Sequence, residues 1–174
     1  MEAVRKARMP AVAMTDHGVM YGAVEFFKAA MTAGVKPLIG CEVYEASGSM
    51  LDRRPDGGKG SYFHLVLLAE SNVGYHNLVN LVTQSHLNGF YYKPRIDMAA
   101  LARHSKGLIG LSACLKGKVA ERLADGDLKS ALAAAGEYAD ILGRDNFFLE
   151  LQDHGIPDQR KVNAGLLEIA KKTG

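Results

Sequence analysis

The sequence has no tryptophan and only two cysteines, Cys41 and Cys114, among its 174 residues. Two thiols cannot build a disulfide framework, and such sparse cysteine use favours a reducing cytoplasm. No apolar run approaches the roughly 20 residues that a membrane-spanning helix needs. The apolar stretch at the start of the chain is also too short for a signal peptide. We therefore expect a cytoplasmic protein with no membrane partner.

A strong excess of one charge is lacking too. The chain has 21 basic and 19 acidic residues, a formal net charge of +2, so it carries no basic stripe of the kind that a self-sufficient DNA-binding domain uses. Phosphate-binding glycine loops, dinucleotide fingerprints and nucleophile elbows are absent, and a Ser or Cys nucleophile is therefore not supported. The hydrophobic content of 48% is enough for the core of one globular domain.

Short apolar runs alternate with longer segments of helical periodicity. We predict strands at residues 10–14, 37–46, 62–70, 107–114 and 146–155. Helical spacing and stop signals predict helices at residues 2–8, 19–33, 73–87, 97–104, 117–125, 127–143 and 158–173. Residues 47–61 are rich in Gly, Asp and Pro and are expected to form a loop. With right-handed crossovers, this alternation implies an α/β sheet or barrel.

One segment, FYYKPR at residues 90–95, combines aromatic and basic side chains. Proteins that bind single-stranded nucleic acid use this combination. We favour a packed loop that closes one end of the domain and keep the nucleic-acid contact as the alternative.

Side chains that can bind metals lie on or beside separate predicted strands. They are Asp16, His17, Glu42, His64, Cys114, Asp153 and His154. Residues at the carboxyl ends of barrel strands converge on one face, and imidazole, carboxylate and thiolate donors suit zinc, manganese or iron. Taken singly, each histidine is more often a surface or capping residue, and Cys114 would be a small buried hydrophobe. Cys41 points to the opposite face of its strand from Glu42, so we expect it in the core.

The residue identities in several sequence blocks are more distinctive than the spacing of the candidate metal ligands. These blocks are PAVAMTDHGVMYGAVEF, GCEVY, GYHNLVNLVTQSH, YYKPRID, LIGLSACLKG and FFLELQDHGIPDQ. In this order, and through nearly the whole chain, they resemble the PHP domain family in the form found in the alpha subunits of bacterial DNA polymerase III. The resemblance implies a distorted, TIM-like (β/α) barrel with a site for up to three divalent metal ions. The matching ligands are His17, Glu42, His64, Cys114 and His154, with Asp16 orienting them.

The resemblance also implies a function. The metal site would be a phosphoesterase or 3′–5′ exonuclease-type site, in which a metal-bound water attacks phosphorus. The parent protein would be a DNA-directed DNA polymerase that uses magnesium, DNA and deoxynucleotides. Its partners would be a proofreading exonuclease subunit and a sliding clamp.

Two elements of the family pattern are missing. An H-x-H-T element expected upstream of Met1 is absent, and so is an N-D-x-H element expected after Gly174. We therefore expect residues 1–174 to be a PHP domain that is incomplete at both ends, a partial barrel without its first and closing strands. The polymerase carboxylates also fall outside this chain, so it would not polymerise DNA alone.

Two other functions remain open. The domain could be a non-catalytic scaffold that docks a proofreading exonuclease, or a small-molecule phosphatase of the histidinol-phosphatase type. The long loop at 47–61 and the polymerase-type blocks argue against the phosphatase. Metal content and phosphoesterase activity would distinguish a catalytic site from a scaffold.

Overall fold

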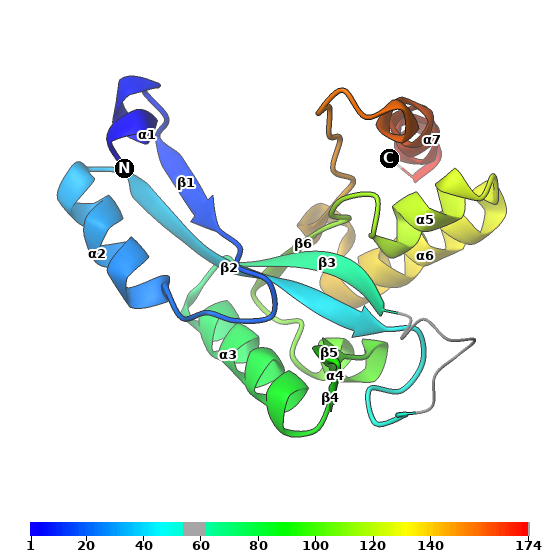
Figure 1. Cartoon of the computed structure of the whole chain (residues 1–174), viewed down its shortest axis with the longest axis horizontal. Coiled ribbons are helices and arrows are strands. Elements are labelled where there is room, and N and C mark those ends of the chain that lie inside the picture. The colour runs from blue at the N-terminus through cyan, green and yellow to red at the C-terminus, as the bar shows by residue number, and fades with distance from the viewer. Residues whose placement is uncertain (54–61, 174) are drawn as a thin grey trace.

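The computed structural model describes residues 1–53 and 62–173. Its helices are α1 (Glu2–Lys6), α2 (Ala23–Ala33), α3 (Asn72–Leu87), α4 (Met98–Arg103), α5 (Lys118–Ala124), α6 (Leu128–Leu142) and α7 (Pro157–Thr173), with a 3-10 turn η1 (Arg144–Asn146). Its strands are β1 (Ala11–Met14), β2 (Lys36–Ala46), β3 (Tyr62–Ala69), β4 (Phe90–Tyr91), β5 (Lys93–Ile96), β6 (Leu108–Leu111) and β7 (Phe147–Phe148). The fold is α/β (Figure 1).

The strands form one mixed sheet with the order β4-β5-β2-β3-β6-β7, and β1 also pairs with β2. The long strand β2 is parallel to β1 and β5 but antiparallel to β3, and β3 is antiparallel to β6. This differs from the parallel crossovers that the sequence pattern suggested. No helix lies among the described residues between β2 and β3, and antiparallel neighbours need no crossover helix.

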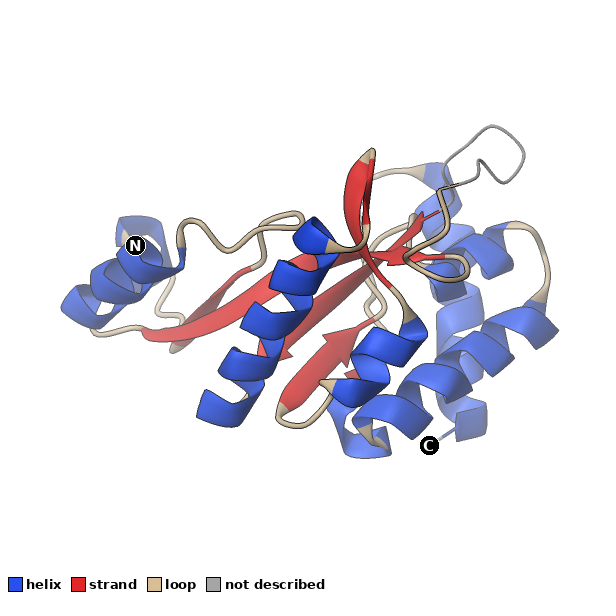
Figure 2. Ribbon diagram, turned by 90° about the horizontal axis from the view of Figure 1, so that it is seen from below, coloured by secondary structure: helices blue, strands red, loops and turns tan. Residues whose placement is uncertain are grey.

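The helices are distributed unevenly along the sheet. Figure 1 shows α1 and α2 beside β1 at one end, and α5, α6 and α7 together at the other. Figure 2, seen from below, shows helices flanking the sheet. One apolar cluster joins these layers. Its fully buried members include Leu65 and Leu67 of β3, Leu78 of α3, Leu101 of α4 and Ile169 of α7.

Three helices begin at a side-chain cap. Ser71, Asp97 and Asp127 each accept a hydrogen bond from the backbone N–H three residues later, at 3.2, 2.8 and 2.9 Å. Each such cap contributes about 1 kcal/mol, because it satisfies an N–H that the first turn leaves unpaired. With these caps, α3, α4 and α6 each start one residue from the predicted position.

Two predicted segments differ in the structure. The strand predicted at 146–155 is wrong beyond Phe148, because β7 pairs with β6 only over Gly110 and Leu111 and Gly155 then turns the chain at φ +74°. The aromatic segment predicted as a loop forms the β4–β5 hairpin instead. The predicted loop at 47–61 falls partly outside the described residues. Within the described part of the chain, no helix is both long and apolar enough to cross a membrane.

Candidate metal centre

Strand β2 supplies the central carboxylate of the site. Successive side chains of a strand face opposite ways, so Cys41 and Val43 are buried in the core while Glu42 and Tyr44 lie on the other face. The antiparallel pairing of β2 with β3 sets Tyr44 opposite His64. Glu42 and His64 therefore share one face of the sheet, and Cys41 is a core residue as predicted.

The chain after β1 continues alongside β2 and brings in His17. Glu42 donates its backbone N–H to the carbonyl oxygen of Asp16 (3.0 Å), and its own carbonyl accepts the N–H of Gly18 (2.9 Å). This pairing makes a parallel bridge between His17 and Glu42. Gly18 has φ +68°, and a Cβ there would lie 2.8 Å from Cγ of Pro94. A glycine is thus required both by the backbone and by the close approach of β5.

Cys114 arrives from the turn after β6. The residue before it, Ala113, has φ +60°, a conformation that is uncommon for a residue with a Cβ and that clusters at functional sites. The backbone N–H of Lys116 donates to Sγ of Cys114 (3.4 Å), and its carbonyl accepts the N–H of His64 (2.9 Å). The turn is therefore fastened to β3, and Cys114 lies beside His64.

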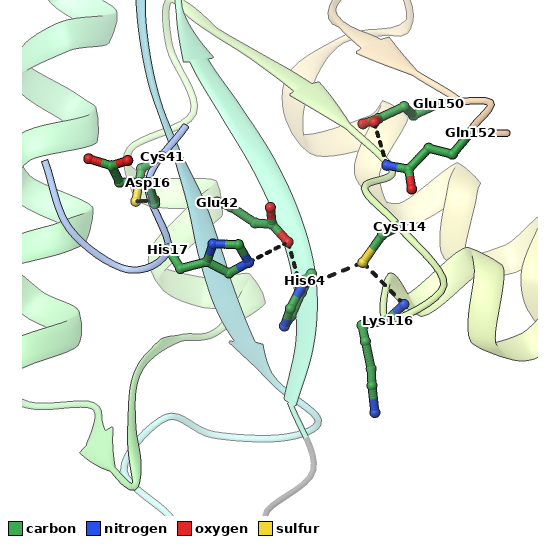
Figure 3. Close-up of polar contacts among 9 residues, drawn as sticks. All are labelled: Asp16, His17, Cys41, Glu42, His64, Cys114, Lys116, Glu150 and Gln152. Atoms are coloured by element: carbon green, nitrogen blue, oxygen red, sulfur yellow. Dashed lines mark hydrogen bonds and ion pairs between the residues drawn. The ribbon is translucent and has the colours of Figure 1, made fainter. Parts of the chain in front are cut away.

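The polar atoms of these side chains meet in a small space (Figure 3). Oε1 of Glu42 lies 3.3 Å from Nε2 of His17 and 2.5 Å from Nδ1 of His64. Potential ligand atoms of these three residues all lie within 4.8 Å of one another. Sγ of Cys114 is 3.7 Å from Nδ1 of His64. We call these four residues the metal cluster.

The charges within the cluster support one another. Hydrogen bonds to Cys114 and to Glu42 raise the pKa of His64 to about 9. The same contacts lower the pKa of the Glu42 carboxyl and of the Cys114 thiol, in each case chiefly through the hydrogen bond to His64. The Glu42 carboxylate and the Cys114 thiolate thus both favour the protonated imidazole of His64.

A divalent cation would suit this arrangement. Imidazole nitrogen, carboxylate oxygen and thiolate sulfur are ligands of zinc, and related sites hold manganese or iron. If a cation replaced the proton on His64, the donor atoms of Glu42 and Cys114 would already lie close to it. Part of the cluster is also open, since 56% of the His17 side chain is exposed but only 13% of His64 and 15% of Glu42. The residues present therefore fit a metal ion that an outside molecule can reach.

Two other predicted site residues lie differently. His154 is exposed and lies outside the group described above. Its backbone N–H donates to Oε1 of Gln159 (2.8 Å), and its Nδ1 lies 3.0 Å from Nε2 of the same side chain. Asp16 contacts the site through its backbone carbonyl, while its carboxylate points away from His17 (Figure 3). The roles of both residues stay predictions.

Two aromatic residues of the site were not identified from the sequence. The ring centroid of Tyr44 is 5.3 Å from that of His64 and 6.2 Å from that of His17, and Tyr62 stacks on His64 at 6.0 Å. Both follow the two-residue period of a strand, Tyr44 from Glu42 and Tyr62 from His64. That period could have placed them at the site.

Comparison with known proteins assigns the family. The PHP domain family matches residues 1–154. DNA polymerase III subunit alpha of Thermus aquaticus is 51% identical over 166 residues, which are 95% of this chain and 14% of that protein. The same subunit of Deinococcus radiodurans is 44% identical over 99% of this chain and 13% of its own length, and that of Treponema pallidum is 43% identical over 94% and 14%. The chain thus spans about a seventh of the length of these relatives.

One solved structure, described as a metal-dependent phosphoesterase from Bifidobacterium adolescentis, aligns with 99% of this chain and 76% of its own. Its TM-score of 0.45 and identity of 13% are too low to bear on this fold. The family match, in contrast, confirms the predicted PHP-type α/β class. The chain belongs to the PHP domain family, and its sequence is similar to a region of DNA polymerase III alpha subunits.

Proposed function

We propose that the metal cluster binds divalent metal ions, and that the chain is the metal-binding PHP portion of a longer replicative DNA polymerase. The observation that carries the metal site is the Glu42 carboxylate, which lies between His17 and His64 with Cys114 beside them. Zinc, manganese or iron suits these donors. Resemblance to the family adds His154 as a further ligand and up to three ions in the whole domain.

The similarity to DNA polymerase III alpha subunits supports the proposal for the whole protein. It would be a DNA-directed DNA polymerase of the cytoplasm that uses magnesium, DNA and deoxynucleotides, with a proofreading exonuclease subunit and a sliding clamp as partners. Residues 1–174 would then be part of its PHP domain.

The cluster itself favours hydrolysis of a phosphoester. A bound metal would supply an activated water and stabilise charge on the phosphate. Glu42 holds both imidazoles through one carboxylate oxygen. The ring of Tyr44 lies roughly perpendicular to that of His64, and the ring of Tyr62 stacks parallel to it. The more exposed His17 leaves the open side on which a substrate can approach.

A second candidate function is a structural brace. The cluster joins the segment after β1, both central strands and the turn after β6. A metal held there would connect four parts of the fold without any catalysis. This would suit a scaffold that docks a separate exonuclease.

One variant separates these functions. Glu42→Gln keeps the shape of the side chain but removes its negative charge, and His76→Ala, in an exposed part of α3, is the matched control. In the full-length protein we would measure bound metal by mass spectrometry, release of nucleotides from a single-stranded DNA 3′ end, and thermal stability. Loss of metal and of hydrolysis in Glu42→Gln alone supports the catalytic site.

The other outcomes are equally informative. Wild-type protein that binds metal but hydrolyses nothing, and whose Glu42→Gln variant melts at lower temperature, supports the brace. Wild-type protein that retains no zinc, manganese or iron after dialysis contradicts the metal site itself.

A further inference from the structure

The aromatic and basic segment at residues 90–95 lies next to the metal cluster. It forms the hairpin of β4 and β5, with Phe90 paired to Pro94 and Tyr91 to Lys93. The hairpin projects from the sheet beyond the end of α3 (Figure 2). Strand β5 pairs in parallel with β2 at Tyr44, two residues from Glu42.

The hairpin is held against the loop that carries His17. Gly18 allows Pro94 to approach so closely that a Cβ at Gly18 would lie 2.8 Å from its ring. The carbonyl of Gly18 also lies 2.8 Å from Nε2 of His86, a residue of α3. These contacts fix the position of the hairpin relative to the cluster.

Lys93 of the hairpin places a positive charge over the ring of Tyr44. Its Nζ lies 5.4 Å from the ring centroid of Tyr44, and the same ring contacts those of His17 and His64. Among the described residues, no carboxylate forms an ion pair with Lys93. Lys118, by comparison, is paired with both Glu45 and Glu137. Lys93 is thus a cation on the ring of Tyr44, which borders the cluster, and its charge is available to an anion.

Tyr92, which precedes Lys93 in the chain, presents an exposed aromatic ring. It stands at the tip of the hairpin with φ +56°, a conformation that glycine or asparagine adopts at lower cost. Its side chain is 78% exposed, and its ring meets that of Tyr91 edge to face at 4.7 Å. With this exposure the ring is accessible to a flat ligand.

We propose that Lys93 binds the phosphate of a nucleotide whose ester bond lies at the metal cluster, and that Tyr92 stacks on the base of that nucleotide. This inference rests on the proposed phosphoesterase function and specifies its substrate subsite. Stacking on a side chain requires a base that is free of its partner strand, so the ligand would be the end of a single strand. An ammonium donor and an aromatic platform are the two elements that such sites combine.

A packing role for both residues predicts something different. Lys93 would then only cover the ring of Tyr44, and its reactivity would not depend on phosphate. Acetylation of lysine side chains, read by mass spectrometry of the peptides, measures this directly in the full-length protein. The probes are inorganic phosphate, thymidine 5′-monophosphate and thymidine, each added to protein loaded with manganese. Lys28, an exposed residue of α2, is the internal control.

We expect both phosphate probes to slow acetylation of Lys93 but not of Lys28, and thymidine to have no effect. Tyr92→Ala should raise the thymidine monophosphate concentration for half protection about tenfold, since stacking on one aromatic ring has about that effect. Protection by inorganic phosphate should stay unchanged in this variant. Tyr92→Phe retains the ring and should behave as wild type.

Acetylation of Lys93 at the same rate with and without phosphate overturns the proposal, even if the protein binds metal. A Tyr92→Ala variant that keeps full affinity for thymidine monophosphate overturns the stacking role. Metal content is measured on the same samples. Protein that holds no metal but still shows protection supports this subsite while the proposed metal function fails.

Discussion

Nδ1 of His64 lies 2.5 Å from Oε1 of Glu42 and 3.7 Å from Sγ of Cys114. One nitrogen atom thus faces two groups that carry negative charge when ionised. In the absence of metal, a proton on His64 satisfies both of them. Binding of a metal ion would exchange this proton for a cation, so protonation and metal binding at His64 compete.

The structure predicts different contributions of two histidines to metal affinity. His64 already contacts Glu42 and Cys114, whereas His154 is held by Gln159 and must leave it before it can bind a metal. His64→Ala should therefore lower affinity for zinc by at least about tenfold, and His154→Ala should have a smaller effect. Competition with a chelating dye measures both. Equal losses in the two variants would show that His154 is as well placed as His64.

The second prediction concerns pH in the metal-free protein. Because the pKa of His64 rises from 6.5 to about 9 on folding, its protonated form favours the folded state. This stabilisation is complete below pH 6.5 and is lost as pH rises through about 9. Its size is about 1–2 kcal/mol after allowance for solvent screening. Titration of the imidazole by NMR should give a midpoint near 9.

The Cys114→Ala variant tests which contact raises the pKa of His64. The hydrogen bond to Cys114 is the largest contribution to the raised pKa, so this variant should move the midpoint of His64 back towards the ordinary value. An unchanged midpoint would assign the shift to Glu42 instead.

Much of this arrangement followed from the sequence. Helical periodicity and stop signals placed the long helices, and Ser71, Asp97 and Asp127 cap the helices that they precede. The convergence of His17, Glu42, His64, Cys114 and His154 was predicted from their places at separate strands. The structure brings the first four together, whereas His154 lies outside the group and contacts Gln159.

The remainder depends on pairings that local sequence does not encode. The strand predicted through Gly155 ends at Phe148, because β7 pairs with β6 only at Gly110 and Leu111. The hairpin at Phe90–Ile96 was predicted as a loop because its turn has Tyr92 where glycine or asparagine usually signals one. The two-residue period puts Tyr44 on the same face as Glu42, but only the pairing of β2 with β3 sets it opposite His64.

A third prediction concerns a buried polar group on the core side of β2. Glu45 is 1% exposed, accepts a short hydrogen bond from the hydroxyl of Tyr138 and pairs with Lys118 at 3.3 Å. Glu45→Ala would leave the buried hydroxyl of Tyr138 without its acceptor and would leave Lys118 with Glu137 as its remaining partner. We expect it to lower the free energy of unfolding by about 3 kcal/mol, since removal of one member of a buried pair has this effect.

The matched control is Glu137→Gln, which removes the other, 55% exposed partner of Lys118. Exposed ion pairs contribute at most about 1 kcal/mol, so this variant should unfold close to wild type in urea. Similar losses in both variants would mean that Glu45 is better solvated than its burial indicates.

The last prediction tests how α3 packs against the chain before β6. A Cβ on Gly74 would lie 1.7 Å from the carbonyl oxygen of Gly107, a backbone atom that cannot move aside alone. Gly74→Ala should therefore destabilise the protein by about 3 kcal/mol or more, because α3 must shift away from the sheet. Gly136, inside α6, has no atom within 4 Å of an added Cβ, and Gly136→Ala should instead stabilise by up to about 1 kcal/mol through higher helix propensity. The same substitution thus has opposite signs at two helix positions, and urea unfolding of the two variants measures both. If Gly74→Ala unfolds like wild type, α3 does not make this close contact with Gly107.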